Sequence, residues 1–437
     1  MNLPDAFQKQ MQELLGEEYP AYLAAMEEPP VKGIRINTLK MPNQPPEELA
    51  LRPGRYADNG WITRQELIGG TPEYLSGCIY SQEPSASFAV SAMGITEGMK
   101  VLDLCAAPGS KSTQIAEQLN QTGLLFANEI VSSRAQILKE NMERHGAANV
   151  IVTSSDPREI ARVFPSWFDA VLCDAPCSGE GMFRKNPRAV SEWSPESTDA
   201  CAARQAEILK SAAACVKPGG ILLYSTCTFS IAENEANVQK LLEEYPEFEL
   251  IPPAHSGGRP GYPLFPGAEL CRRIYPMDEG EGHFVARLRR TGNIEASKEL
   301  PLLKSEPIPA CADAFLRDHL SKPFPYIYKK GNQIYGGTAP FYDIRPVRLI
   351  RHQVLLGTVK KDRFEPSHAC VLSAFSRFEP RVELTVEELN RYRRGETLRK
   401  ESPNGWVAVT VHDHAIGLAK SDGQILKNHY PKAFRIR

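Results

Sequence analysis

One stretch of the chain decides its fold: Val101-Leu102-Asp103-Leu104-Cys105-Ala106-Ala107-Pro108-Gly109-Ser110-Lys111-Ser112. Its apolar start predicts a buried strand, and the small residues that follow predict a tight turn into a helix. Small residues let a ligand approach the backbone, and a helix N-terminus favours a negative group. The turn lacks the glycines of the GxxxxGK(S/T) and GxGxxG motifs, which argues against a P-loop nucleotidase. Taken alone, it is also compatible with a plain strand–helix connection.

Strand-like and helical segments alternate on both sides of this stretch. The expected strands cover residues 101–105, 124–129, 150–153, 168–174, 220–224 and 282–288, and the expected helices cover 112–119, 135–144, 200–215 and 233–244. Short apolar runs that alternate with helical patterns predict an α/β fold with a mainly parallel, doubly wound, Rossmann-like sheet. In such a sheet, ligands bind in the crevice outside the carboxyl ends of the strands.

The length and composition of the chain predict several domains. We expect residues 1–80 to form a small leading, RNA-binding-like α/β unit with a helix over 7–15 and a strand over 33–39, and residues 81–290 to form the doubly wound domain. The polar, proline-containing segment 289–307 is typical of a linker. We therefore assign 291–370 to a linker and a small accessory domain, and 371–437 to a β-rich domain.

Charge is distributed unevenly along the chain. Residues 291–437 carry 24 Lys+Arg and 16 Asp+Glu, a net charge of +8, whereas the whole chain has a net charge of −2. A basic end on an acidic remainder fits a polyanion-binding appendage, although an ordinary solvated surface is an equal alternative. No long apolar run or basic-then-apolar leader occurs, so we expect a cytoplasmic protein without a membrane segment. The cysteines form no metal-binding pattern, so we expect no metal site.

An acidic residue follows each of three successive strands. Glu129 ends the second strand, where an acid can accept both hydroxyls of a ribose. Asp156 follows the third strand and is placed to bind an adenine amino group, and Asp174 follows the fourth. Singly, each acid is more often a turn residue or a helix cap. Together, around a glycine-containing loop, they favour S-adenosylmethionine as the cofactor.

Two cysteines that lie 50 residues apart each follow a predicted strand. Cys177 lies in Ala175-Pro176-Cys177 after the strand over 168–174, and Cys227 lies in Ser225-Thr226-Cys227 after the strand over 220–224. A thiolate that adds to C6 of a pyrimidine activates C5 toward a methyl group, and a second group must then assist release. A carboxyl such as Asp174, facing N3, would stabilise the adduct. Chemistry alone does not say which thiol attacks, and buried free cysteines are often simply small apolar residues.

These motifs resemble a known family. The stretches 103–111, Asp174-Ala175-Pro176-Cys177-Ser178-Gly179 and Ser225-Thr226-Cys227-Thr228 are similar to the motifs of the Sun-family RNA cytosine-C5 methyltransferases. The resemblance implies cofactor contacts from Cys105 through Lys111 and from Glu129, Asp156 and Asp174. It also implies that Cys227 is the nucleophile and that Cys177 assists release. DNA cytosine-C5 methyltransferases use the earlier Pro-Cys cysteine instead, so only the resemblance decides between the thiols.

Further stretches resemble a subgroup of that family. Gly179-Glu180-Gly181-Met182-Phe183-Arg184-Lys185 looks like the RsmF type, which modifies bacterial small-subunit ribosomal RNA, and 417–420 with 426–432 resemble a PUA-like RNA-binding module. The resemblance implies a class I methyltransferase domain. It also implies 16S ribosomal RNA or the 30S subunit as partner, and we expect a monomer. A transfer RNA methyltransferase and a non-catalytic RNA-binding ribosome-assembly factor remain as alternatives.

Two clusters combine basic residues with aromatic ones, as phosphate contact and base stacking require. The first comprises Arg391, Arg393, Arg394, Arg399 and Lys400 near Tyr392, and the second comprises Lys329, Lys330, Tyr326 and Tyr328. Each cluster could equally be a solvated face.

Overall fold

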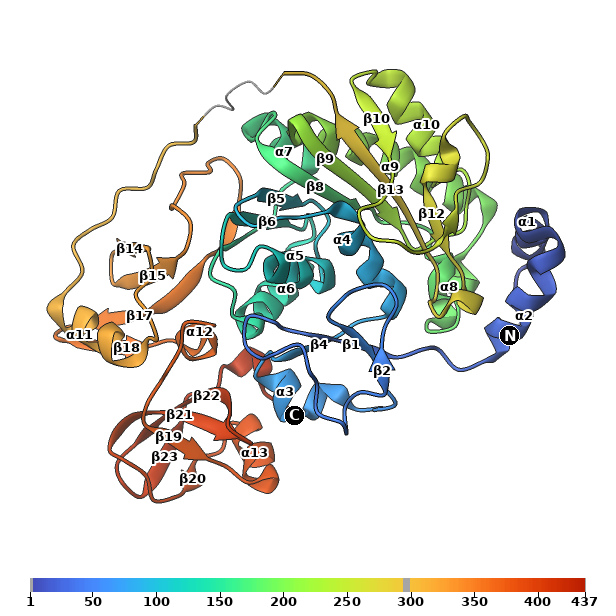
Figure 1. The fold of residues 1–437 in the computed structure, drawn as a ribbon. Coiled ribbons are helices and arrows are strands. Elements are labelled where there is room, and N and C mark those ends of the chain that lie inside the picture. Colours follow the sequence, from blue (N-terminus) through green and yellow to red (C-terminus); the bar gives the residue numbers. More distant parts are fainter. Residues whose placement is uncertain (1–2, 294–298, 437) are drawn as a thin grey trace.

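A mixed ten-stranded sheet forms the centre of the computed structural model, which describes residues 3–293 and 299–436 (Figure 1). Its strands lie in the order β11-β12-β13-β9-β8-β5-β6-β7-β16, and β10 pairs with β13. The bounds are β5 Lys100–Asp103, β6 Leu124–Asn128, β7 Val150–Thr153, β8 Phe168–Asp174, β9 Val216–Thr226, β10 Phe248–Ile251, β11 Arg259–Pro260, β12 Arg272–Ile274, β13 His283–Arg290 and β16 Leu349–His352.

The middle of this sheet is parallel and doubly wound. From β5 the chain adds β6 and β7 on one side, then returns to place β8 and β9 on the other. This reversal confirms the predicted fold class. It also makes the space outside the carboxyl ends of β5 and β8 the switch point, where ligands bind in such sheets.

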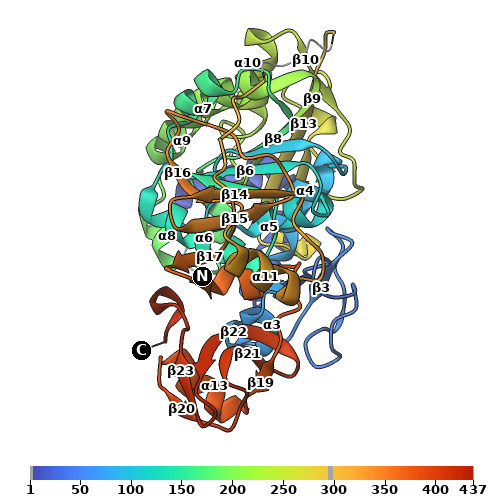
Figure 2. The ribbon, with the colours of Figure 1, turned by 90° about the vertical axis from the view of Figure 1, so that its left-hand side faces the viewer.

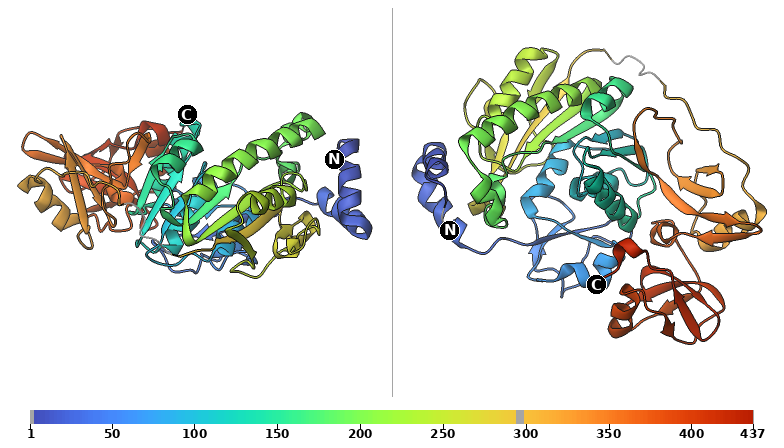
Figure 3. Two further views of the ribbon diagram at one scale, coloured as in Figure 1. Left: turned by 90° about the horizontal axis from the view of Figure 1, so that it is seen from above. Right: turned by 180° about the vertical axis from the view of Figure 1, so that it is seen from behind.

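Helices cover both faces of the sheet (Figure 3). Successive strand residues point to opposite faces, so Leu102 joins one core cluster and Val101 joins the other. The helices of this domain are α4 Phe88–Met93, α5 Ser110–Gln118, α6 Ser132–His145, α7 Pro157–Val163, α8 Pro187–Glu192, α9 Pro195–Cys215 and α10 Glu235–Glu244. Side chains from α4, α5 and α6 pack on the Val101 face, and those from α7, α9 and α10 on the Leu102 face.

The leading unit contacts the central domain at two places. Its helices, α1 (Asp5–Leu15) and α2 (Tyr19–Glu27), share a core cluster with Phe183, Trp193 and Phe229 of the central domain. Its small sheet, in the order β2-β3-β1-β4, packs beside α5. The remaining bounds are β1 Gly33–Ile36, β2 Arg52–Pro53, β3 Gly60–Ile62, α3 Pro72–Leu75 and β4 Ile79–Ser81.

Two small β-rich units follow the central domain (Figure 2). The first has the sheet β14-β15-β17-β18 and the second has β19-β21-β22-β23-β20. Their bounds are α11 Ala310–His319, β14 Tyr326–Lys330, β15 Gln333–Gly337, β17 Val354–Lys360, β18 Arg363–Pro366, α12 His368–Leu372, β19 Arg381–Glu383, α13 Val386–Arg393, β20 Leu398–Arg399, β21 Gly405–Val411, β22 His414–Ser421 and β23 Ile425–Asn428. Strand β16 leaves the first unit and pairs antiparallel with β7, so the accessory region completes an edge of the central sheet.

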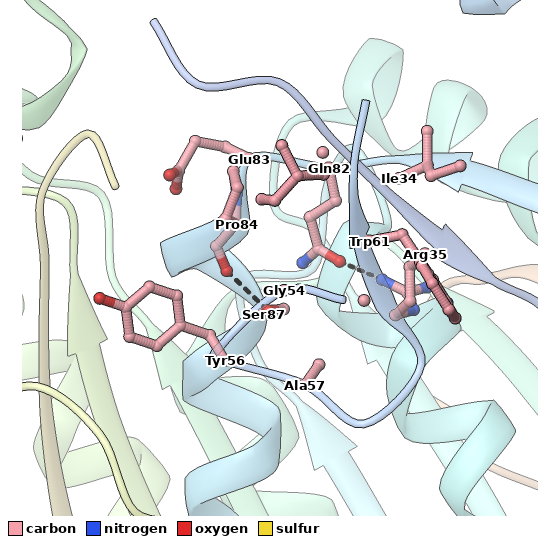
Figure 4. A pocket seen from close by; sticks show the side chains of 13 residues that line it. Ile34, Arg35, Gly54, Tyr56, Ala57, Trp61, Gln82, Glu83, Pro84 and Ser87 are labelled. Carbon is pink, nitrogen blue, oxygen red and sulfur yellow. Dashed lines mark hydrogen bonds between the residues drawn. The ribbon is translucent and has the colours of Figure 1, made fainter. Parts of the chain in front are cut away.

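A buried arginine connects the leading unit to the helix after the 101–112 stretch. Arg35 on β1 is 1% exposed; its Nε lies 2.8 Å from an oxygen of Glu117 on α5, and it also donates to the Ser110 carbonyl at 3.0 Å. Figure 4 shows the same guanidinium reaching the side-chain oxygen of Gln82. Burial alone would raise the pKa of Glu117, but Arg35 and His145 hold it below its ordinary value, so the carboxylate is charged.

Replacement of Arg35 by Met would leave Glu117 as an uncompensated buried charge. We expect a loss of about 3–5 kcal/mol in the free energy of unfolding at neutral pH, measured by urea denaturation. Because folding lowers the pKa of Glu117, its contribution is present above the unfolded carboxyl pKa and disappears as pH falls through the folded value. The double variant R35M/E117Q, which removes both charges, should be more stable than R35M alone; equal stabilities would contradict this account.

Candidate active site

The two cysteine-bearing turns meet at the carboxyl ends of β8 and β9. These strands pair in parallel with Asp174 opposite Ser225, so the turns that follow them are adjacent. The Sγ atoms of Cys177 and Cys227 lie 3.2 Å apart, within hydrogen-bond distance, and both thiols are free. Both residues are partly exposed, so a substrate base can reach them.

Buried polar side chains hold both turns in place. The Glu233 carboxylate accepts hydrogen bonds from the Ser178 backbone N–H at 3.0 Å and from Gln205 at 2.7 Å, which fixes the turn carrying Cys177. Asn234 donates to the Thr228 carbonyl at 2.9 Å and fixes the turn carrying Cys227. The sequence analysis assigned these two residues no role, because neither has a recognisable spacing to the thiols.

The environments of the cysteines differ. The hydrogen bond with Cys227, and then burial, raise the pKa of Cys177 well above its ordinary value, so this thiol keeps its proton in the resting site. Burial also raises the pKa of Cys105 well above its ordinary value. Cys105 is therefore a protonated residue of the loop after β5.

A charged pair lies beside the thiols. The ammonium group of Lys111 is 2.8 Å from Asp174, which also accepts a hydrogen bond from Ser225 at 2.6 Å. Burial would raise the pKa of Asp174, but Lys111 and its other partners lower it below the ordinary value. Burial would lower the pKa of Lys111, but Asp174 and, more weakly, Cys227 raise it. Both groups are therefore charged, and the ammonium group of Lys111 lies close enough to Cys227 for an electrostatic interaction.

The loop from Cys105 to Gly109 connects β5 to α5 next to this pair. Its Ala106 N–H donates to the Asn128 carbonyl at 2.8 Å, and Asn141 and Arg134 donate to the carbonyls of Pro108 and Ala107. Gly109 is the N-cap residue of α5, and no side chain among the described residues caps this helix end. The N–H groups of its first turn therefore remain available to a ligand.

The acids after β6 and β7 lie in different surroundings. Glu129 is 3% exposed and accepts from the Val131 N–H at 2.9 Å, with Arg134 at 3.3 Å. The next residue, Ile130, is a 55% exposed apolar side chain that the sequence analysis missed. Asp156 caps α7, and its carboxylate is engaged by Arg158 at 2.8 Å. The adenine contact of Asp156 remains a prediction.

His283 lies near the charged pair of Lys111 and Asp174. Its Nδ1 lies 3.2 Å from the Ser85 hydroxyl, whose own proton goes to Glu83. Burial and then the nearby Lys111 lower the pKa of His283 to about 4, so the ring is neutral at physiological pH.

One aromatic of the predicted RNA clusters cannot stack on a base. Tyr392 is 2% exposed, and its hydroxyl donates to the Leu418 carbonyl inside the core of the last domain, which overturns its predicted stacking role. Tyr328 is 7% exposed, whereas Tyr326 is 42% exposed. The apolar period of α13 explains the error, because Tyr392 lies three residues after buried Leu389.

Family models match four segments of the chain. Residues 90–289 match "16S rRNA methyltransferase RsmB/F" and 3–84 match the N-terminal domain of 16S rRNA methyltransferase RsmF. Residues 314–373 match the RsmF first C-terminal domain, and 379–436 match the methyltransferase RsmF PUA domain. A relative from Escherichia coli (strain SMS-3-5), ribosomal RNA small subunit methyltransferase F, is 35% identical over 98% of this chain and 96% of its own length. The chain belongs to the RsmF family of methyltransferases.

Another relative and two solved structures agree with this RsmF assignment. The methyltransferase F of Escherichia fergusonii is 34% identical, with coverage of 98% and 96%. A methyltransferase homologue from Pyrococcus horikoshii has a TM-score of 0.59 and 30% identity, over 66% of this chain and 95% of that one. NSun6 from Pyrococcus horikoshii, solved with SFG, has a TM-score of 0.56 and 21% identity, over 66% and 99%, and shares the fold.

As a member of this methyltransferase family, the chain uses S-adenosylmethionine, and the residues at the switch point fit it. An oxygen of Asp103 is buried without a hydrogen-bond partner, while the other accepts from Ser112 at 2.6 Å. Burial raises the pKa of Asp103 to about 7, and a cationic amino group would satisfy the free oxygen. The ribose contact of Glu129 remains a prediction.

Two further properties concern metal ligands and membrane-spanning helices. In the parts of the chain that the structure describes, no three His, Cys, Asp or Glu side chains gather as metal ligands would. None of the described helices has the length and apolar character that a bilayer span requires.

Replacement of Gly109 by Ala should weaken cofactor binding. Its φ of +113° favours glycine, and a Cβ there would lie 3.1 Å from Leu138, so the loop must shift. We expect at least about 10-fold weaker S-adenosylmethionine binding by calorimetry, because the α5 N–H groups move. The matched control is Gly267→Ala, where φ is +94° and a Cβ meets nothing within 4 Å. Equal losses of cofactor affinity in both variants would contradict the assigned role.

Proposed function

We propose that this chain transfers a methyl group from S-adenosylmethionine to C5 of a cytosine in 16S ribosomal RNA, through a covalent bond between Cys227 and C6 of the base. In this proposal the chain acts as a cytoplasmic monomer on the small subunit or its RNA. The observation that carries the reaction is the pair of thiols 3.2 Å apart, next to the charged Lys111 and Asp174.

The reaction begins with addition of the Cys227 thiolate to C6. The C6–S bond forms while the C5–C6 double bond opens, and N3 takes up a proton from solvent, which it returns when the base is released; the carboxylate of Asp174 stabilises the protonated ring. The opened base is an enamine whose C5 is a nucleophile. S-adenosylmethionine supplies the electrophilic methyl group. Loss of the C5 proton then restores the double bond and expels the Cys227 sulfur.

The different environments of the thiols support this division of roles. The hydrogen bond with Cys227, and then burial, raise the pKa of Cys177 well above its ordinary value and keep this thiol protonated, while the charged Lys111 lies close enough to interact with Cys227. Once Cys227 has become a thioether, the thiol–thiol hydrogen bond that contributes most to the raised pKa of Cys177 is lost. Cys177 can then give its proton to solvent and, as the thiolate, accept the C5 proton, which couples release to completed attack. The reverse assignment would require attack by Cys177, whose pKa lies well above its ordinary value.

The RNA substrate is supported by the relatives rather than by the thiols. The full-length relatives are named small-subunit ribosomal RNA methyltransferases, and the last domain matches a PUA model. Addition to C6 requires an unstacked cytosine, which favours an accessible loop or single strand. The complete set of Cys177, Cys227 and Asp174 argues against a non-catalytic assembly factor.

Cysteine substitutions test the chemistry. With labelled S-adenosylmethionine and small-subunit RNA, Cys227→Ala should abolish formation of 5-methylcytosine, because no adduct can form. Cys177→Ala should retain attack but fail in release, so a protein–RNA adduct that survives denaturing electrophoresis should accumulate. Cys201→Ala, which removes a partly exposed thiol of α9, is the matched control and should keep activity. An adduct with Cys227→Ala, or none with Cys177→Ala, would overturn the division of roles.

The same assay tests the substrate. Unmodified small subunits, naked 16S RNA and bulk transfer RNA are compared, with Cys227→Ala alongside each. Label in subunits or in 16S RNA is expected. Label in transfer RNA alone would retain the chemistry and overturn the substrate, and no label despite cofactor binding would favour the assembly-factor alternative.

A further inference from the structure

A large cavity lies between the first C-terminal unit and the edge of the central sheet. Its volume is about 870 Å³, and its walls come from α6, β14, β15, β16 and β17. That volume is in the range of sites for sizeable organic ligands. The cavity is separate from the thiols and from the loop after β5, and the reaction described above uses none of its residues.

One wall holds a buried arginine without an ion pair. Arg351 on β16 is 7% exposed, and among the described residues its guanidinium makes only two long hydrogen bonds, to the carbonyls of Val150 at 3.4 Å and Ala147 at 3.3 Å. Burial lowers its pKa to about 10, opposed by Glu143, so it remains charged at neutral pH. Glu143 itself is bound to His368 at 3.1 Å. Because a buried charge normally has a bound counter-charge, Arg351 points to an anionic ligand.

Other charges on the cavity agree with an anion. Lys139 and Lys330 line it, and neither has a carboxylate within ion-pair distance in the described part of the chain. The acidic side chains that line it, Glu143 and Asp343, are each paired, the latter with Arg345. The net unpaired charge of the cavity is therefore positive.

The facing wall is aromatic. Tyr328 and Tyr335 are directly opposite one another on β14 and β15, so their rings share a face of that sheet, with centroids 6.1 Å apart. Phe341 stacks on Tyr328 at 5.2 Å and contacts His352 at 4.6 Å. His352 is 5% exposed, and neither ring nitrogen has a hydrogen-bond partner among the described residues. Aromatic rings beside cationic groups are the combination that binds single-stranded nucleic acid.

The strand pairing places one end of the cavity on the carboxyl-end side of the central sheet. Leu349 at the start of β16 is opposite Thr153 at the carboxyl end of β7. Just before it, Arg348 exchanges hydrogen bonds with Ser154 and Ser155, at 2.9 and 3.0 Å. One end of the cavity therefore lies on the carboxyl-end side of the sheet, and the cofactor loop and the thiols lie on that same side.

We propose that this cavity binds a single-stranded segment of the RNA substrate, with a phosphate at Arg351 and a base against Tyr335. This inference rests on the proposed function, and it assigns to the first C-terminal unit a part in RNA binding distinct from that of the PUA domain. An RNA segment is favoured over a free nucleotide for two reasons. One end of the cavity lies on the carboxyl-end side of the sheet, where the thiols also lie, and residues 291–437 carry a net charge of +8.

Binding of a fluorescein-labelled single-stranded RNA of about ten nucleotides to the full chain tests the proposal. Arg351→Met should weaken binding about 10- to 100-fold, the effect of losing a charged hydrogen bond. Lys330→Ala should weaken binding and reduce the slope of log affinity against log salt by about 0.7. Tyr335→Ala should weaken binding at least about 5-fold, with little change in that slope. Lys240→Ala removes an exposed positive charge on α10; it is the charge-matched control and should have no effect.

A thermal melt of each variant separates RNA binding from folding. If Arg351 serves the ligand rather than the fold, Arg351→Met should melt at or above the wild-type temperature, because it removes an unpaired buried charge. If Arg351→Met unfolds the chain, Lys330→Ala and Tyr335→Ala decide the question. Unchanged RNA affinity in these two variants would overturn the proposal.

Two further measurements separate the RNA proposal from a nucleotide site and from failure of the proposed function. Adenosine monophosphate that binds in the cavity and is lost in Arg351→Met, with RNA affinity unchanged, would assign the cavity to a free nucleotide and overturn the RNA proposal. RNA binding that depends on Arg351 and Tyr335 in a chain that transfers no methyl group would support the cavity and contradict the proposed function instead.

Discussion

The parallel pairing of β8 with β9, with Asp174 opposite Ser225, is the constraint on which the site depends. The turns that carry Cys177 and Cys227 both begin within three residues of this pair. Because side chains alternate along a strand, a slip of one residue would turn Asp174 away from Ser225 and Lys111. The β-ladder therefore determines the distance between the thiols before any substrate arrives.

Buried polar contacts then keep the turns rigid. Glu233 and Asn234 satisfy the backbone of the two turns from within the protein, and Glu180 accepts bonds from the Phe229 N–H and the Trp193 indole. Glu180 also accepts a bond from Gln10, so helix α1 of the leading unit is tied to the turn after β9. In a region of low dielectric such a network is stable only when its members are satisfied together. The leading unit thus supports both the thiols and, through Arg35, the cofactor helix.

The C-terminal units are continuous with the catalytic sheet. Strand β16 joins the edge of that sheet, so the first of these units is held by backbone hydrogen bonds. A rigid connection of this kind keeps an RNA contact in the accessory region at a constant distance from the reacting base. That geometry suits an enzyme that must hold one nucleotide of a large, structured RNA at its cofactor.

Much of the central domain could be predicted from local patterns. The apolar runs at 101–105 and 168–174 are typical of parallel strands, and the small residues from Cys105 to Gly109 indicate a ligand turn, because both signals reside in neighbouring residues. Contacts between distant segments had no such signal. The residues that neighbour Glu233 and Arg351 in the chain do not show that Glu233 holds the Cys177 turn or that Arg351 lines a cavity. Tyr392 lies in a basic stretch typical of a surface, but the core of the last domain buries it. The sequence by itself determined the succession of strands and helices in the central domain and the chemistry of the turns, since these depend on residue type and spacing. Only the tertiary structure decided which charges are paired, which thiol keeps its proton and which aromatic rings face solvent, because those properties depend on burial and on partners far away in the chain.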